Sequence, residues 1–335
     1  MSELGRRFRR QRGGMAAASV LAVIYLLAIF AGFFSPFDAN TGDIRMRYVP
    51  PQRVRLIDAD GWHAPFVHGL HSTRDPETQE FVWTVDATAR FPLRLFHGGR
   101  LISCEGPFHI LGTDRLGRDL FSRILAGARV SMSVGLGGVL IVLVLGSTLG
   151  TLSGYYGGVL DLAMQRVIEV LSSFPSIPLW MALAAALPAT WSGIWVYVAI
   201  TLILSLLGWG GLARQVRGKV LAARELDYVM AARAAGAGDG YLMRKHVFPS
   251  AWSHVIVTTT LGIPGMILGE TALSFLGLGI RPPLTSWGVL LEEAQRVTVL
   301  LHYPWLLFPA LPVVIVVIAW NVVGEALREA VDPFA

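Results

Sequence analysis

Cysteine and charged residues are scarce in this 335-residue chain. The single cysteine, Cys104, has no partner for an intramolecular disulfide, and we expect an isolated buried thiol. Charged residues make up 15% of the chain and hydrophobic residues 53%. A single soluble core could not cover so many apolar side chains, so the composition excludes an ordinary soluble domain and favours a lipid bilayer as the solvent.

Motifs for nucleotide binding and for common enzyme chemistry are also missing. A phosphate-binding G-x-x-x-x-G-K-[S/T] loop is approached only at 218–220, where Gly-Lys-Val lacks both the glycine frame and the hydroxyl. The chain contains no H-E-x-x-H, C-x-x-C or G-x-S-x-G pattern. We therefore predict no ATPase site, no catalytic residues and no cofactor.

A small histidine group is the one arrangement that suggests a metal. It comprises His63, His68 and His71, with Asp75 nearby. These residues fall in a turn-rich segment without helical register, so we predict no metal site. The excess of Lys and Arg over Asp and Glu, 28 against 23, reflects membrane orientation and predicts no nucleic-acid partner.

The apolar residues gather into runs of about 20, the length that a helix needs to cross a bilayer. Six such runs lie at 15–34, 130–152, 162–187, 194–213, 252–276 and 304–323. The first follows an arginine-rich opening and lacks a convincing cleavage site, so residues 1–34 predict a cytoplasmic N-terminus and an uncleaved signal anchor. The fold class expected is an all-α membrane protein with six transmembrane helices.

Positive charges near the ends of the runs indicate the orientation. Five arginines precede the first run: Arg6, Arg7, Arg9, Arg10 and Arg12. Residues 214–250, between the fourth and fifth runs, are also rich in Lys and Arg. Short loops with this bias stay in the cytoplasm, so both termini and this loop are expected there, with residues 35–129 on the outer face.

The outer segment divides into two parts. Residues 40–104 mix strand and turn signals, with alternation at 47–57 and short strands expected around 81–85 and 91–96. Residues 114–129 repeat apolar side chains every four positions and predict an amphipathic surface helix before the second span. Its arginines Arg115, Arg118 and Arg123 are candidates for a gate or a docking surface. The alternative is that the helix only anchors the lobe.

Two spans contain residues that lipid-facing helices rarely tolerate. Glu169, Pro175 and Pro178 interrupt the third span, and Pro264 and Glu270 interrupt the fifth. Such residues normally face protein or a water-filled cavity, which makes these two spans candidates for the lining of a pathway. The alternative is that the glutamates join helices together or lie near a membrane boundary.

The cytoplasmic loop contains an alanine-rich segment at 224–236 that predicts a short helix ended by glycine. Its alanines would allow close insertion into another surface, Gly236 would permit a sharp exit, and Pro249 would mark the entry to the fifth span. From these residues alone, docking onto a partner and packing against the chain's own helices both remain open.

The spacing of Ala231, Ala232, Gly236 and Pro249 resembles the cytoplasmic coupling motif of permeases from binding-protein-dependent ABC importers. The motif's leading glutamate is Met230 here. Residues 111–123, LGTDRLGRDLFSR, resemble the segment before the second span in the C-type subunit of dipeptide and oligopeptide permeases. Residues 153–158, 270–279 and 286–288 are similar to the same branch, so the resemblance covers about 110–335.

This resemblance implies one permease subunit of an ATP-driven importer in a bacterial inner membrane, forming half of the translocation pathway. It implies three kinds of protein partner: a second permease, two ATP-binding subunits and an external substrate-binding protein. Membrane lipid surrounds such a subunit, and its cargo is peptide-like. Two alternatives stay open: the same fold importing nickel chelates, opines or sugar conjugates, and a proton-coupled secondary transporter that uses Glu169 or Glu270.

Overall fold

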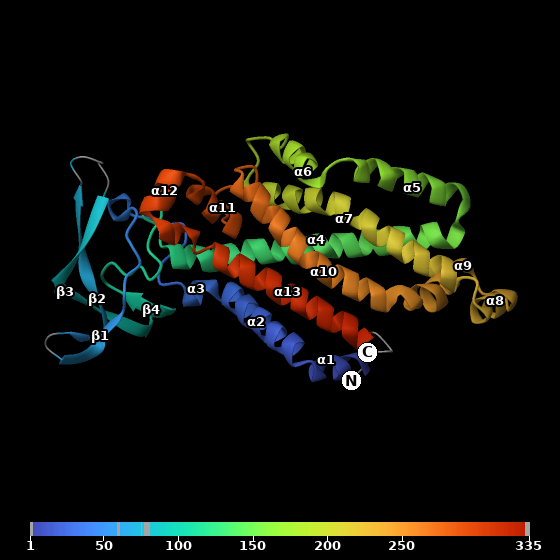
Figure 1. The fold of residues 1–335 in the computed structure, drawn as a ribbon, viewed down its shortest axis with the longest axis horizontal. Helices are drawn as coiled ribbons and strands as arrows, with labels where there is room; N and C mark the ends of the chain where they lie inside the picture. The colour runs from blue at the N-terminus through green and yellow to red at the C-terminus, as the bar shows by residue number, and fades with distance from the viewer. Residues whose placement is uncertain (1–2, 59–60, 75, 77–80, 332–335) are drawn as a thin grey trace. The chain divides into compact units, whose positions relative to one another are not determined.

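The computed structural model describes residues 3–58, 61–74, 76 and 81–331, and the fold is mostly helical (Figure 1). The α-helices are α1 (Glu3–Arg10), α2 (Arg12–Ile29), α3 (Ala31–Phe34), α4 (Leu120–Tyr156), α5 (Gly158–Ser173), α6 (Ser176–Ala185), α7 (Gly193–Ala223), α8 (Asp227–Ala234), α9 (Asp239–Leu242), α10 (Phe248–Phe275), α11 (Trp287–Glu292), α12 (Val297–His302) and α13 (Ala310–Val331). Shorter helical turns are η1 (Ile44–Met46), η2 (Met243–Val247), η3 (Glu293–Gln295) and η4 (Pro304–Leu307).

Among the described residues, five helical stretches are long and apolar enough to cross a membrane: Arg12–Ile29, Leu120–Tyr156, Gly193–Ala223, Asp239–Phe275 and Pro304–Val331. The pair α5 and α6 also passes as one span, broken by a bend of 85°. Pro175 lies at this break, where a proline, which has no backbone N–H, does not disturb a helical hydrogen bond. Counting the bent pair as one span, the six predicted spans are confirmed by length and composition.

The chain forms two compact units. The first contains the described residues of Met1–Ala22, Met132–Ile280 and Val314–Ala335, and the second contains Val23–Ser131 and Arg281–Val313. In the first unit, glycines of α4 recur every four positions at Gly146, Gly150 and Gly154, facing α7. An added Cβ on Gly150 would lie only 2.5 Å from the carbonyl oxygen of Ala213. These small residues let the two helix backbones approach closely, as is common between membrane helices.

The start of α2 also meets the end of the last described helix, α13, within the first unit. Gln11 Nε2 donates to Glu329 Oε2 at 2.8 Å. Gly14 leaves room for Ala326, because a Cβ on Gly14 would lie 2.5 Å from the Ala326 methyl group. Residues 11–14 and 326–329 therefore lie side by side in the first unit.

The second unit contains a four-stranded antiparallel sheet in the order β1 (Arg55–Asp58), β2 (Gly61–Arg74), β3 (Phe81–His97), β4 (Arg100–Cys104). The two short strands predicted around 81–85 and 91–96 are parts of one long β3, and the register shifts between them, opposite His68 and Gly69. The strand predicted at 47–57 is mostly wrong. Pro50 and Pro51 cannot donate to a ladder, and only β1 forms there.

The surface helix predicted at 114–129 is also wrong. Residues 111–119 are turns and isolated bridges, and helix α4 begins only at Leu120 and continues without interruption to Tyr156. Two glycines explain the turns. Gly112 and Gly117 have φ of +80° and +68°, and each would clash with a backbone carbonyl if it carried a side chain. The four-residue apolar spacing therefore belongs partly to a tight loop and partly to the start of the second span.

Candidate functional site

Helix α8 and its glycine exit form the first part of the candidate site. Leu226 precedes the helix in an extended conformation, and α8 runs over Asp227–Ala234 as the alanine-rich pattern predicted. Gly236 then adopts φ +90°, a left-handed conformation that glycine tolerates best. Its N–H donates to the Arg233 carbonyl at 3.0 Å, and the N–H of Ala237 donates to the Ala232 carbonyl at 3.1 Å. This hydrogen bonding closes the helix and redirects the chain.

Most of the exposed side chains on and just before α8 are apolar, although Asp227 and Arg233 are also exposed. Leu226, Tyr228 and Met230 are each nearly half exposed, whereas Val229 is fully buried and holds the helix to the unit. Ala231 is exposed and Ala232 half-buried, so the small residues of the predicted motif lie at the surface. Apolar side chains are therefore exposed on a short helix that is held in place by the buried Val229.

A tyrosine at the end of α4 ties the α8 loop to the spans. The Tyr155 hydroxyl donates to Asp239 Oδ1 at 2.7 Å and accepts from Arg233 Nη2 at 3.2 Å. The Arg233 guanidinium also lies 5.6 Å from the centre of the Tyr155 ring. Arg224, just after α7, donates to the carbonyls of Gly154 and Tyr155 at 3.1 and 3.2 Å. The ends of α4 and α7, α8 and the start of α9 are thus joined by one polar network.

An ion pair between Arg217 and Asp161 fixes the α4–α5 turn at the same end of α7. Arg217 on α7 contacts both carboxylate oxygens of Asp161, with Nε–Oδ1 and Nη2–Oδ2 distances of 2.5 Å. Ser153 on α4 donates to Asp161 Oδ1, also at 2.5 Å. Two-point pairing of an arginine with a carboxylate restricts both position and direction. The turn at 153–158, singled out in the sequence, is therefore held rigidly against α7.

Pro249 lies at the start of α10, where a proline is tolerated because the first helical N–H groups have no partner in the helix. It follows the π-helical turn η2, in which the His246 ring contacts Tyr241 at 5.5 Å between centroids. Tyr228 of α8 donates to the His246 carbonyl at 3.3 Å. The α8 helix is thus connected to η2, which continues into α10, as well as to α4.

A cavity of about 370 Å³ lies among α4, α6, α7 and α10 in the first unit. Its walls are mainly apolar, with Trp180, Leu204 and Met266 among the lining residues, while Gln215 and Thr258 supply polar groups. Thr258 Oγ1 donates to Gln215 Oε1 at 3.0 Å. An apolar hollow with a few polar groups is the usual form of a ligand-binding cavity.

The predicted pathway residues do not line this cavity. Glu270 is fully buried in α10 and accepts a hydrogen bond from Ser274 at 2.7 Å, whereas Glu169 is exposed and pairs with Arg166 at 2.8 Å. Pro264 is buried inside α10. Pro175 and Pro178 are close in sequence to two residues of the cavity wall, Ser176 and Trp180 of α6. Pro175 was the sequence feature that pointed to the region of the cavity. The side chains that line the cavity carry no distinctive motif.

The arginines predicted to face a partner surround Asp114 instead. Asp114 is 1% exposed; its Oδ1 accepts from the backbone N–H groups of Leu116 and Arg118 at 2.8 and 3.0 Å. Its Oδ2 accepts from Arg118 Nε at 2.7 Å and from the buried guanidinium of Arg123. Arg115 alone keeps an exposed side chain. The motif at 111–123 thus builds a buried ion network, and a gating role for these arginines stays a prediction.

Two neighbours complete this part of the second unit. Arg123 Nη2 also donates to Thr285 Oγ1 at 3.3 Å, and the N–H of Arg115 donates to Glu293 Oε1 at 2.9 Å. Burial, together with the nearby negative charge of Asp114, raises the pKa of the Glu293 carboxyl. The network therefore joins the 111–123 loop to the segment 285–293.

No group of three or more His, Cys, Asp or Glu side chains in the described part of the chain could hold a metal ion. His63, His68 and His71 all lie on β2, and Asp75 lies outside the described residues.

Comparison with known families gives the class of protein. The profile of the family described as "binding-protein-dependent transport system inner membrane component" matches residues 146–335, and the profile described as the N-terminal TM domain of oligopeptide transport permease C matches residues 1–51. The chain belongs to the first family. It is an integral inner-membrane permease subunit of an ABC importer, of the C type found in peptide systems, and not an enzyme.

Curated relatives extend this match over nearly the whole chain. The oligopeptide transport system permease protein OppC of Bacillus subtilis is 32% identical over 328 residues, which are 98% of this chain and 87% of that protein. The glutathione transport system permease protein GsiD of Pectobacterium atrosepticum is 40% identical over 231 residues, 68% and 74% of the two chains. A solved structure of the MetNI methionine ABC transporter is 17% identical with a TM-score of 0.44, covering 61% of this chain and 96% of that one.

Proposed function

We propose that this permease forms half of the translocation pathway of an importer for dipeptides or oligopeptides. The observation that carries the proposal is the α8 assembly: a short helix with exposed apolar side chains, tied through Arg233 to Tyr155 of α4 and through Tyr228 to η2, which continues into α10. When a docked partner displaces a helix held in this way, the attached helices should move with it, because the contacts resist local deformation. The peptide-related names of the relatives support the choice of cargo.

Energy enters from partner subunits in this proposal. Two ATP-binding subunits close on ATP and displace α8, while a second permease supplies the other half of the pathway. The links through Tyr155 and His246 pass the displacement to α4 and α10, which border the 370 Å³ cavity. An external binding protein delivers the peptide, and alternating access follows from the nearly rigid movement of these helices.

The cargo can be tested in cells that carry the partner subunits with or without this chain. Uptake of a labelled dipeptide should depend on the chain, because the apolar cavity accepts short side chains while Gln215 and Thr258 offer hydrogen bonds to a peptide backbone. Excess unlabelled peptide should compete, whereas nickel chelates, opines and sugar conjugates should not. Competition by one of these three, with none by peptides, would replace the proposed cargo within the same fold.

The proposed orientation places both termini and α8 in the cytoplasm and the β-sheet outside. With Cys104 replaced by serine, cysteines introduced at Ser72 on β2 and at Gly240 beside Asp239 should react with a membrane-impermeant thiol reagent from opposite sides. Both positions are exposed, and Gly240 avoids removing the Asp239 contact with Tyr155. Labelling of both cysteines in intact cells would refute this orientation.

A further inference from the structure

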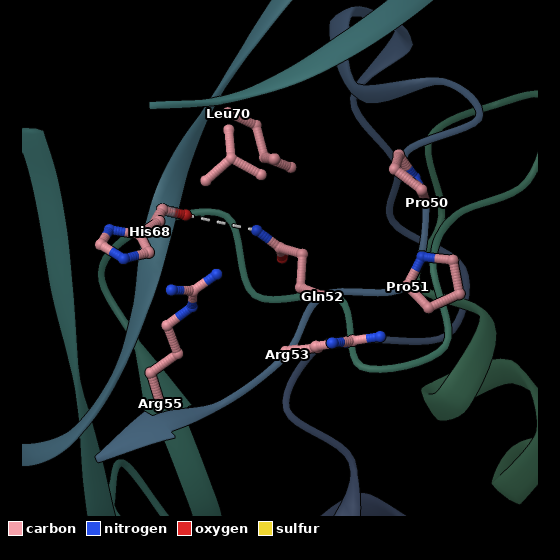
Figure 2. Close-up of a pocket in the computed structure, with 8 residues that line it drawn as sticks. Pro50, Pro51, Gln52, Arg53, Arg55, His68 and Leu70 are labelled. Carbon is pink, nitrogen blue, oxygen red and sulfur yellow. Dashed lines mark hydrogen bonds between the residues drawn. The ribbon is translucent and has the colours of Figure 1, made fainter. Parts of the chain in front are cut away.

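The segment 40–104 with its sheet is called the β-lobe. A cavity of about 260 Å³ in this lobe has the composition of a small anion site (Figure 2). Its walls come from the segment 50–55 and from the facing part of the sheet: Pro50, Pro51, Gln52, Arg53, Arg55, His68, Leu70 and Val85. Two of these residues are arginines, and no carboxylate belongs to the lining among the described residues. The cavity is therefore cationic, and it is separate from the cavity of the first unit.

Neither arginine pairs with an acidic side chain of the described residues. The guanidinium groups of Arg53 and Arg55 make no ion pair with any residue in the described parts of the chain, and both side chains are exposed. Most other arginines of this lobe are engaged: Arg94 pairs with Glu105 at 2.8 Å, and Arg100 donates to the Pro36 carbonyl. Two unpaired guanidinium groups at one cavity attract an oxyanion, and their planar fork suits a carboxylate.

Gln52 and His68, two further residues of the cavity wall, are held by contacts within the chain. Gln52 exchanges two bonds with the backbone of His109: its N–H donates to the His109 carbonyl at 2.9 Å, and its Oε1 accepts from the His109 N–H at 2.7 Å. Its Nε2 donates to the His68 carbonyl at 3.4 Å, the dashed line in Figure 2. The buried His68 ring packs edge-on against Phe66, with centroids 5.2 Å apart. This part of the cavity wall is thus fixed before a ligand arrives.

Apolar groups complete the cavity. Pro50, Pro51, Leu70 and Val85 form a hydrophobic surface beside the arginines. Free phosphate could use only the charges, whereas a carboxylate attached to an apolar residue would also bury carbon atoms. A second hollow, of about 470 Å³, is lined by 53–57, so both arginines border both hollows. A ligand held by its carboxylate therefore has room to continue along β1.

We propose that the Arg53–Arg55 cavity binds the carboxyl end of a short peptide or acylated amino acid, with the carboxylate on the guanidinium groups and the last side chain against the prolines, Leu70 and Val85.

Titration calorimetry on the purified full-length chain in detergent tests this proposal, with N-acetylleucine as the probe. N-acetylleucinamide has the same shape without the negative charge and should bind about tenfold more weakly or worse. Inorganic phosphate should also bind more weakly than N-acetylleucine, because it lacks the apolar part. The Arg55→Gln and Arg53→Gln variants should each weaken binding of N-acetylleucine about tenfold or more.

The matched control is Arg45→Gln, an exposed arginine of the same lobe that does not line the cavity. It should leave binding unchanged, and melting temperatures should show all three variants equally folded. Equal binding of the acid and the amide, equal binding of phosphate, equal weakening by Arg45→Gln, or no saturable binding of N-acetylleucine would each overturn the proposal.

Discussion

Replacing Gly236 by leucine should lower peptide uptake by the assembled transporter about tenfold or more while the chain remains in the membrane. Gly236 has φ +90°, and no atom lies within 4 Å of an added Cβ, so the effect comes from backbone strain and not from a clash. A side chain in the left-handed region costs about 1–2 kcal/mol, which corresponds to about tenfold in an equilibrium. The strain would redirect α8 relative to its docking partner. ATP hydrolysis by the partner subunits should then continue without matching transport.

Gly240→Leu is the matched control for this change. Gly240 is also exposed, also has open space around it, and lies only four residues further along the chain, but its φ is not in the left-handed region. Uptake and ATP hydrolysis should remain coupled in this variant. Normal uptake by Gly236→Leu would show that coupling does not depend on the left-handed turn at Gly236.

The proposed coupling between α8 and α4 can also be weakened from the α4 side, without substituting a residue of α8. Tyr155→Phe removes the hydroxyl that contacts Asp239 and Arg233 but keeps the ring. Tyr156→Phe serves as the control, because Tyr156 is half exposed and its ring contact with Tyr155 would remain. The transport obtained per ATP should fall only in the first variant. Equal behaviour of the two would show that the polar network does not carry the coupling.

Asp114→Asn should destabilise the chain more than any other single change considered. The amide keeps the shape of the turn but loses the negative charge beside Arg123, whose side chain is 6% exposed. Removing one partner of a buried pair leaves an uncompensated charge and costs about 3–5 kcal/mol. We expect a clear fall in melting temperature in detergent and in the amount of chain found in the membrane.

Two further variants separate this explanation from general damage. The double variant Asp114→Asn with Arg123→Gln removes both charges and should recover part of the lost stability. Glu105→Gln breaks the exposed pair with Arg94 and should change the melting temperature little, because exposed pairs contribute about 0–1 kcal/mol. If the double variant is less stable than Asp114→Asn alone, the buried charge is not the cause.

The helical framework was predictable because its signals are local. Apolar runs of membrane length, and an alanine-rich stretch ending at Gly236, indicated the spans and helix α8. The turn at 111–119 was missed because the spacing of Leu116, Leu120 and Ile124 imitates a helix, while the real constraint lies in distant backbone. Gly117 must leave room for the carbonyl of Asp43, a contact that no local pattern reveals.

The structural settings of the candidate site residues could likewise be predicted only in part. Gly236 and Pro249 could be predicted, since each solves a local backbone problem. The contact of Tyr155 with Asp239 could not, because it joins residues 84 positions apart that meet only after α4 and the α8 loop are folded. Glu270 was chosen as an intramembrane carboxylate, yet helix packing encloses it beside Ser274 and away from the cavity. Composition shows that a charge is unusual in a span, but only the packing shows which way it faces.

Peptide uptake into liposomes tests the central claim most directly. The liposomes would contain this chain, the second permease and the ATP-binding subunits, and external binding protein and labelled dipeptide would be added with either internal ATP or a pH gradient alone. The account predicts accumulation only with ATP, and only when this chain is present. Accumulation driven by the pH gradient without ATP, or ATP-driven accumulation without this chain, would contradict it.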